Sequence, residues 1–103
     1  MAEWMTVGDA GDVAEGDVNS YSVGDRSVAV ANVDGKLFAF DDVCSHQQCS
    51  LSEGDLDDTV IECPCHGSQF DVTTGDVVEG PAADPIDTFE VREGEGQLEV
   101  SVE

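Results

Sequence analysis

Basic residues are scarce in this sequence. Only Arg26, Lys36 and Arg92 oppose 24 acidic residues, so the 103-residue chain has a formal net charge of −21. This balance argues against nucleic acid as a partner, because phosphates would be repelled and no basic patch could release counterions. Anionic membrane surfaces are disfavoured for the same reason. A partner protein with a basic face is the docking candidate that the charge predicts.

Long apolar runs are also missing. No stretch approaches the roughly 18 apolar residues of a membrane span. Residues 1–9 lack the basic and apolar regions of a signal peptide, so we expect a soluble, cytoplasmic protein. The acidic residues are spread along the whole chain, which predicts a halophilic protein. At about 1 M salt the Debye length is about 3 Å, and the self-repulsion is then largely screened. Ordinary acidic solubility is the alternative.

Strand patterns dominate, and no stretch shows a sustained helical period. Asp34-Gly35 separates the runs 27–33 and 36–40, which predicts a hairpin because such turns need positive φ. Apolar and polar residues alternate on both sides of 94–96, which predicts a second hairpin. Weaker candidates are strands at 4–7, 18–23 and 59–62 and a single helical turn at 12–16. The residues expected in the core are Phe38, Phe40, Phe89 and Val91, with Trp4 packed on the β base.

Cysteine and histidine are confined to one segment. All four cysteines and both histidines lie between positions 44 and 66, which indicates a single site. Cys44-Ser45-His46 and Cys63-Pro64-Cys65-His66 form two arms that each offer one thiolate and one imidazole. A two-Cys, two-His zinc finger instead places both cysteines on one arm. The mixed arms therefore favour a binuclear iron–sulfur cluster, with zinc on the same residues as the alternative.

These two motifs, with Gly67-Ser68 after them, resemble the Rieske family. The resemblance implies one [2Fe–2S] cluster, with Cys44 and Cys63 on the inner iron and His46 and His66 on the outer iron. It implies an all-β fold: a single domain, 1–103, with an antiparallel β sandwich or barrel base. A small loop-rich cluster-binding subdomain is expected at about 42–70. Gly80-Pro81-Ala82 is similar to the family's third loop, which covers the cluster.

The resemblance also assigns residues around the cluster. Cys49 and Cys65 match a disulfide of Rieske proteins in cytochrome complexes, although a reducing cytosol would favour two thiols. Ser68 matches a serine that donates a hydrogen bond to a cluster sulfide in high-potential members. Phe70 stands where those members carry a tyrosine that bonds a cysteine sulfur. Because Phe70 has no hydroxyl, we predict a potential below the top of the Rieske range, ≈ −150 to +300 mV.

The resemblance implies a soluble ferredoxin that passes single electrons from a reductase to an oxygenase or another oxidoreductase. Two alternatives are the small subunit of an assimilatory nitrite reductase and the soluble part of a cytochrome-complex Rieske protein. A redox-sensing module is an alternative of another class. The chain offers no spare histidine for catalysis, so none is assigned to it alone. The acidic run Glu53, Asp55, Asp57 and Asp58 lacks the ligand order of an EF-hand and is expected to be a solvated insertion.

Overall fold

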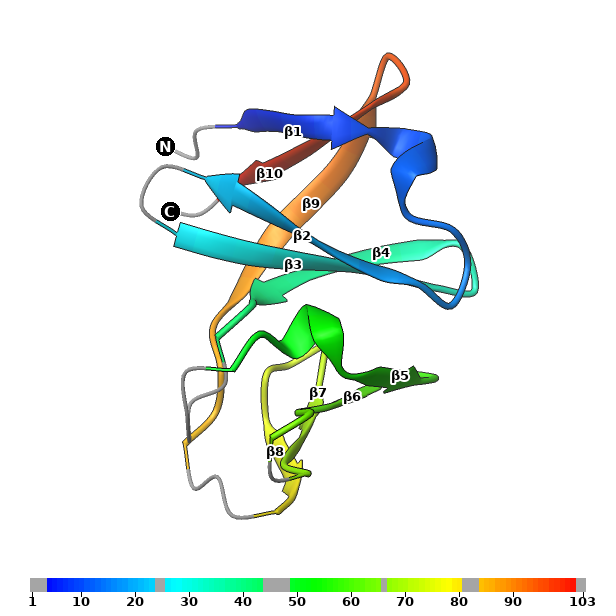
Figure 1. Cartoon of the computed structure of the whole chain (residues 1–103). Helices are drawn as coiled ribbons and strands as arrows, with labels where there is room; N and C mark the ends of the chain where they lie inside the picture. The colour runs from blue at the N-terminus through cyan, green and yellow to red at the C-terminus, as the bar shows by residue number, and fades with distance from the viewer. Residues whose placement is uncertain (1–3, 24–25, 44–48, 66, 81–83, 102–103) are drawn as a thin grey trace.

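The computed structural model describes residues 4–23, 26–43, 49–65, 67–80 and 84–101 (Figure 1). This part of the chain contains ten β-strands, two short 3-10 helices and no α-helix, which confirms the all-β prediction. The elements are β1 (Met5–Asp9), η1 (Ala10–Asp12), β2 (Val18–Val23), β3 (Arg26–Val33), β4 (Lys36–Asp41), η2 (Leu51–Glu53), β5 (Asp55–Asp57), β6 (Val60–Glu62), β7 (Gln69–Asp71), β8 (Val77–Glu79), β9 (Thr88–Gly94) and β10 (Gln97–Ser101). Among the described residues, no helix is long and apolar enough to cross a membrane.

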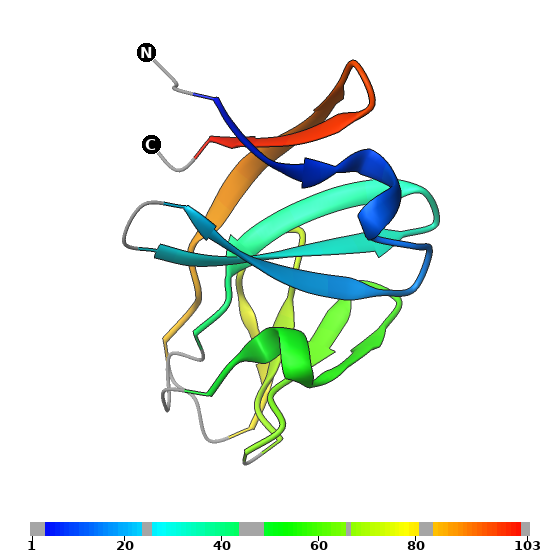
Figure 2. The ribbon, with the colours of Figure 1, turned by 45° about the horizontal axis from the view of Figure 1, so that its top comes forward.

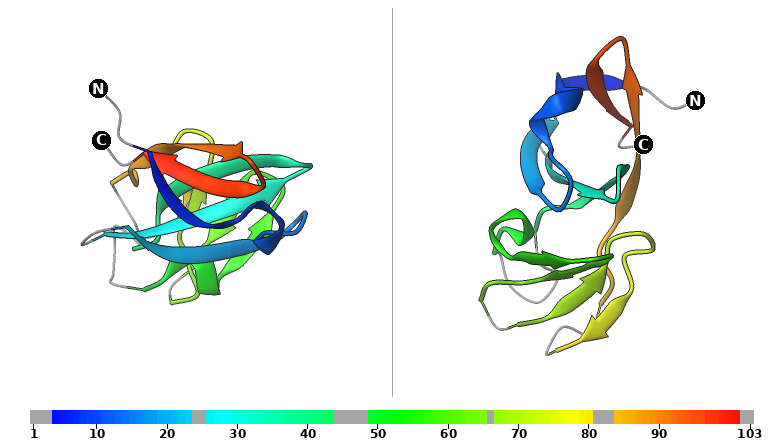
Figure 3. Two further views of the ribbon diagram at one scale, coloured as in Figure 1. Left: turned by 90° about the horizontal axis from the view of Figure 1, so that it is seen from above. Right: turned by 90° about the vertical axis from the view of Figure 1, so that its right-hand side faces the viewer.

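Six strands form the larger sheet, in the order β1-β10-β9-β4-β3-β2. Every pair in it is antiparallel. The sheet curls on itself as an open barrel, which Figure 3 shows from above and from the side. Its apolar interior consists of Val13, Val23, Val28, Val30, Ala39, Leu98 and Val100. This barrel is the β base that the sequence predicted.

Both predicted hairpins are present in the barrel. Asp34 and Gly35 connect β3 to β4 with φ values of 53° and 87°, the left-handed conformation that the turn requires. The side chain of Asn32 supports this turn, because its Oδ1 accepts a hydrogen bond from the Gly35 N–H at 2.9 Å. Glu95 and Gly96 form the corresponding turn between β9 and β10. The residues at the two turns therefore predicted both hairpins of the barrel correctly.

The bounds of the more weakly predicted elements differ from the observed ones by a few residues. Strand β2 covers the predicted 18–23, whereas β1 extends beyond the predicted 4–7 to Asp9. The helical turn occupies residues 10–12 instead of 12–16. It starts earlier because the Asp9 N–H donates to Asp12 Oδ2 at 3.0 Å and closes the turn there.

Four short strands between β4 and β9 form a second antiparallel sheet, in the order β5-β6-β7-β8. Figures 1 and 2 show it below the barrel, and in Figure 1 η2 lies between the two. The second sheet continues to Glu79 and so extends beyond residue 70. Strand β6 was predicted as 59–62, whereas β5, β7 and β8 were not predicted.

One apolar cluster joins the barrel to the second sheet. Its buried members from the barrel are Ala29, Ala31, Val33 and Phe40. Its buried members from the chain between β4 and β9 are Leu51, Ile61, Cys63, Phe70, Val72 and Ile86. Of the aromatic residues expected in the core, Phe40 is fully buried, whereas Phe38 and Phe89 are half-buried against the two clusters. Val91 and Trp4 are half-buried too, and the Arg92 guanidinium lies 4.0 Å from the centroid of the Trp4 ring.

The acidic run adopts regular structure. Asp55 and Asp57 are exposed at the two ends of β5, while Leu56 between them packs against the apolar cluster. Asp58 has a φ of 54° and forms the turn into β6. The carboxylates are solvated as expected, but the segment is a hairpin because Leu56 fixes its register.

Candidate metal centre

Of the four predicted cluster ligands, Cys63 lies within the part that the structure describes. Cys44, His46 and His66 lie outside the described residues, as does Pro81 of the third loop. At this site the structure describes Cys63 and the residues that flank positions 44–48 and 66.

The turn between β6 and β7 carries the second arm. Cys63 directly follows β6, and its side chain is buried in the apolar cluster, 2% exposed. The Cys63 N–H donates to the Ser68 carbonyl oxygen at 2.7 Å, and the Gly67 N–H donates to the Cys63 carbonyl oxygen at 3.1 Å. These two bonds fold residues 63–68 into a compact turn. The turn buries Cys63 and leaves Cys65 exposed.

Asp42 links the described residues on either side of the first arm. The Asp42 side chain is 2% exposed, and its carboxylate accepts hydrogen bonds from Ser27 Oγ at 3.1 Å and from the Ser52 N–H at 2.8 Å. The Asp42 carbonyl oxygen also accepts from the Leu51 N–H at 2.6 Å. One buried residue thus holds the start of η2 beside the end of β4. The sequence analysis missed Asp42, because nothing in the sequence separates it from the other acidic residues.

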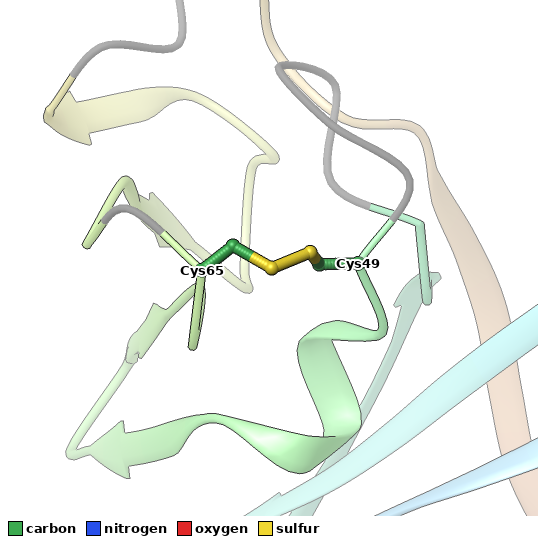
Figure 4. The surroundings of a disulfide bond; sticks show 2 residues. All are labelled: Cys49 and Cys65. Atoms are coloured by element: carbon green, nitrogen blue, oxygen red, sulfur yellow. A yellow bond between two sulfur atoms is a disulfide. The ribbon is translucent and has the colours of Figure 1, made fainter.

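Cys49 and Cys65 bring the two arms together. The structure joins their sulfur atoms, with the Cα atoms 6.5 Å apart (Figure 4). The Cys63 Sγ lies within 4.8 Å of both of these sulfurs. The three cysteine sulfurs that the structure describes therefore lie together where the two arms meet.

The other residues that the resemblance assigned to the site gather around Cys63. Ser68 is 1% exposed, and Gly80, directly after β8, packs over it. Phe70 is fully buried on β7, where it pairs with Ile61 and Val77. Phe70 and Cys63 belong to the same apolar cluster.

A hydroxyl added at Phe70 should raise the reduction potential. In Phe70→Tyr, a hydrogen bond to a cysteine sulfur would stabilise the reduced, more negative cluster. Each kcal/mol of preferential stabilisation corresponds to about 40 mV for one electron, and a typical hydrogen bond contributes about 1 kcal/mol. Protein-film voltammetry would measure the shift. An unchanged or lower potential would show that position 70 does not face the sulfur.

The residues present fit a [2Fe–2S] cluster. The segments that carry the two arms approach each other at Cys49 and Cys65, whose Cα atoms lie 6.5 Å apart. The Cys63 thiol is buried, and burial and hydrogen bonding are among the factors that set the potential of an iron–sulfur cluster. Two thiolates and two imidazoles form the donor set expected for a cluster of this mixed type.

Comparisons with known proteins identify the family. The model of the Rieske [2Fe-2S] domain matches residues 3–90. Ferredoxin CarAc of Metapseudomonas resinovorans is 41% identical over 101 residues, which cover 97% of this chain and 94% of the relative. The solved Sphingomonas yanoikuyae B1 ferredoxin has a TM-score of 0.90 at 32% identity and covers 96% of this chain and 98% of its own. A chain in the solved complex of reduced oxygenase and oxidised ferredoxin in carbazole 1,9a-dioxygenase has a TM-score of 0.88 at 40% identity, over 95% of this chain and 92% of that one. This protein therefore belongs to the Rieske [2Fe-2S] family and carries one [2Fe–2S] cluster.

Proposed function

We propose that this protein is a ferredoxin that delivers single electrons to the oxygenase of a multicomponent oxygenase system. One observation carries the proposal: the chain matches, at 40% identity and over nearly its whole length, a chain of a solved complex of oxygenase and ferredoxin. The relative from Metapseudomonas resinovorans is also a ferredoxin. A one-electron carrier needs a donor as well as an acceptor, so the proposal includes a reductase.

The cluster ligands in this proposal are Cys44 and Cys63 on the inner iron and His46 and His66 on the outer iron. The burial of Cys63 and the spacing of the two arms support this assignment. When bound, the cluster supplies a site that accepts and returns one electron. Two neutral imidazoles in place of two thiolates reduce the negative charge of the site. The potential then lies above the ≈ −400 mV of ferredoxins with four cysteine ligands.

The charge distribution supports a partner with a basic docking face. Within the described ranges, the ion pairs join Arg26 to Asp87 at 3.5 Å and Arg92 to Glu99 at 2.8 Å. Most of the acidic residues that the structure describes are exposed to solvent. Such a surface attracts a basic partner and repels nucleic acid and anionic lipid. The rate at which the protein associates with a basic partner should fall as salt screens the charges.

Two measurements test this function. Iron and acid-labile sulfide analysis, with electron paramagnetic resonance of the dithionite-reduced protein, should show two irons per chain and the spectrum of mixed Cys/His ligation. Stopped-flow absorbance should then show the reduced protein losing its electron to a dioxygenase component of the carbazole type. Zinc in place of iron would contradict the cofactor. A reduced cluster that no oxygenase reoxidises would contradict the proposed partner.

The alternatives predict different behaviour. A nitrite reductase subunit would co-purify with a large partner, whereas a ferredoxin would elute alone and exchange partners. A cytochrome-complex subunit would deliver its electron to a cytochrome and not to an oxygenase. A redox sensor would lose its cluster on oxidation, whereas a carrier survives repeated reduction and reoxidation. The comparison with ferredoxins favours the carrier.

We also propose that Cys49 and Cys65 form a disulfide in the mature protein. A Cα separation of 6.5 Å lies within the range that a disulfide spans, which supports the pairing. Alkylation of the unreduced, denatured protein, followed by mass spectrometry, should leave Cys49 and Cys65 unmodified. Labelling of both residues would refute the bond. A cytoplasmic location and a halophilic origin stay predictions of the sequence, and a reducing cytosol would work against this bond.

A further inference from the structure

Gly80 sits in a position that no other residue can occupy without displacing its neighbour. A Cβ built on Gly80 would lie 2.5 Å from Ser68 Cα, 3.1 Å from Ser68 N and 3.1 Å from Ser68 Oγ. Its φ of 110° is also a conformation that side-chain-bearing residues rarely adopt. Both the space and the backbone conformation therefore require glycine here.

The register of the second sheet creates this contact. Gln69 on β7 pairs with Glu79 on β8, so the residues just beyond this pair, Ser68 and Gly80, lie against each other. Ser68 is 1% exposed and has little free space into which it could retreat. Pressure on Ser68 would therefore move its backbone.

Ser68 passes such a movement directly to a cluster ligand. Its carbonyl oxygen accepts the hydrogen bond from the Cys63 N–H at 2.7 Å, and the two residues close the turn after β6. The Ser68 hydroxyl lies on the side that Gly80 contacts. A shift of Ser68 would consequently reorient both its own hydroxyl and the Cys63 sulfur.

We propose that Gly80 is a positioning residue for the cluster, and that its missing side chain lets the end of β8 pack against Ser68 and so hold Ser68 and Cys63 in place. This inference rests on the proposed role of Cys63 as a ligand. The close fit keeps the Ser68 hydroxyl in place. The resemblance to the Rieske family gives this hydroxyl the role of a donor to a cluster sulfide, and such a donor stabilises the reduced state. Crowding at Gly80 should therefore lower the reduction potential and speed the loss of the cluster.

The test compares Gly80→Ala with Gly75→Ala in the cluster-loaded protein. Gly75 has a φ of 83°, and a Cβ there would collide with the carbonyl oxygen of Ile86, so this control carries the same kinds of backbone strain without touching Ser68. Both variants should melt at lower temperature. Only Gly80→Ala should lower the midpoint potential, change the electron paramagnetic resonance spectrum and bleach faster in the presence of a chelator.

A double variant shows whether Gly80 acts through the Ser68 hydroxyl. Ser68→Ala alone should lower the potential. Gly80→Ala should then lower the potential much less in the Ser68→Ala background than it does in the wild-type background. If Gly80→Ala does not fold, Ser68→Thr replaces it, because it keeps the hydroxyl and adds a methyl group in the same packed space. A potential equal to the wild type in Gly80→Ala, or in Ser68→Thr when it stands in, would overturn the inference. A wild-type protein without a cluster would instead overturn the proposed function.

Discussion

Lowering the salt concentration from about 1 M to about 10 mM should lower the melting temperature by at least about 10 °C. The Debye length grows from about 3 Å to about 30 Å over this range, so a net charge of −21 repels itself across the whole molecule at low salt. For a domain of this size, each kcal/mol of lost stability lowers the melting temperature by roughly 4–8 °C. Circular dichroism melts at a series of NaCl concentrations measure the effect. A melting temperature that does not respond to salt would contradict the prediction of a halophilic protein.

A pair of variants can separate the repulsion between two neighbouring carboxylates from the repulsion that the total net charge causes. Asp55 on β5 stands directly opposite Glu62 on β6, and like charges in that arrangement destabilise a sheet. Asp57, at the other end of the same strand, stands opposite Val60. Asp55→Lys and Asp57→Lys change the net charge equally, but only the first turns a repulsive pair into an attractive one. We therefore expect both variants to melt higher at low salt, with Asp55→Lys gaining more. Equal gains would show that only the total charge matters.

Removal of the Asp42 carboxylate should destabilise the protein by about 3 kcal/mol and release the cluster. Asp42→Ala leaves the Ser27 hydroxyl and the Ser52 N–H without their buried acceptor, and hydrogen bonds to a charged group contribute about 1.5–3 kcal/mol each. The loop that carries Cys44 and His46 would then lose the closure at its base. Denaturant unfolding at high salt measures the stability, and the iron content per chain measures cluster retention.

The neighbouring residue provides the control for Asp42. Asp41 is half-buried, and among the described residues its Oδ1 accepts a hydrogen bond from the Val43 N–H at 3.0 Å. Asp41→Ala removes the same charge one position away, so it should cost less than Asp42→Ala and retain the cluster. Asp42→Asn keeps an oxygen that can accept from Ser52 and should fall between the two. An Asp42→Ala variant with wild-type stability and iron content would show that the buried carboxylate does not hold the loop.

The sequence predicted those features that depend on neighbouring residues. Asp34-Gly35 determines its turn by itself, and the spacing of the Cys and His arms specifies a type of site without reference to the fold. Strands β5, β7 and β8 have only three residues each, which is too short for an alternating pattern to stand out. The role of Asp42 depends on Ser27, which β3 brings beside it, and the fit of Gly80 depends on the register of β8. Such contacts arise only after strands distant in sequence have paired.

Strand β3 is buried on both sides, and this ties the two halves of the molecule together. Val28 and Val30 point into the barrel, while Ala29 and Ala31 form part of the wall on which the second sheet rests. Ala29 and Ala31 of the barrel thus form part of the apolar interior beneath the second sheet. A fragment spanning only the two metal-binding arms would expose that interior to water. Anyone wishing to graft the redox centre onto another scaffold would have to supply a strand with similarly small side chains beneath it.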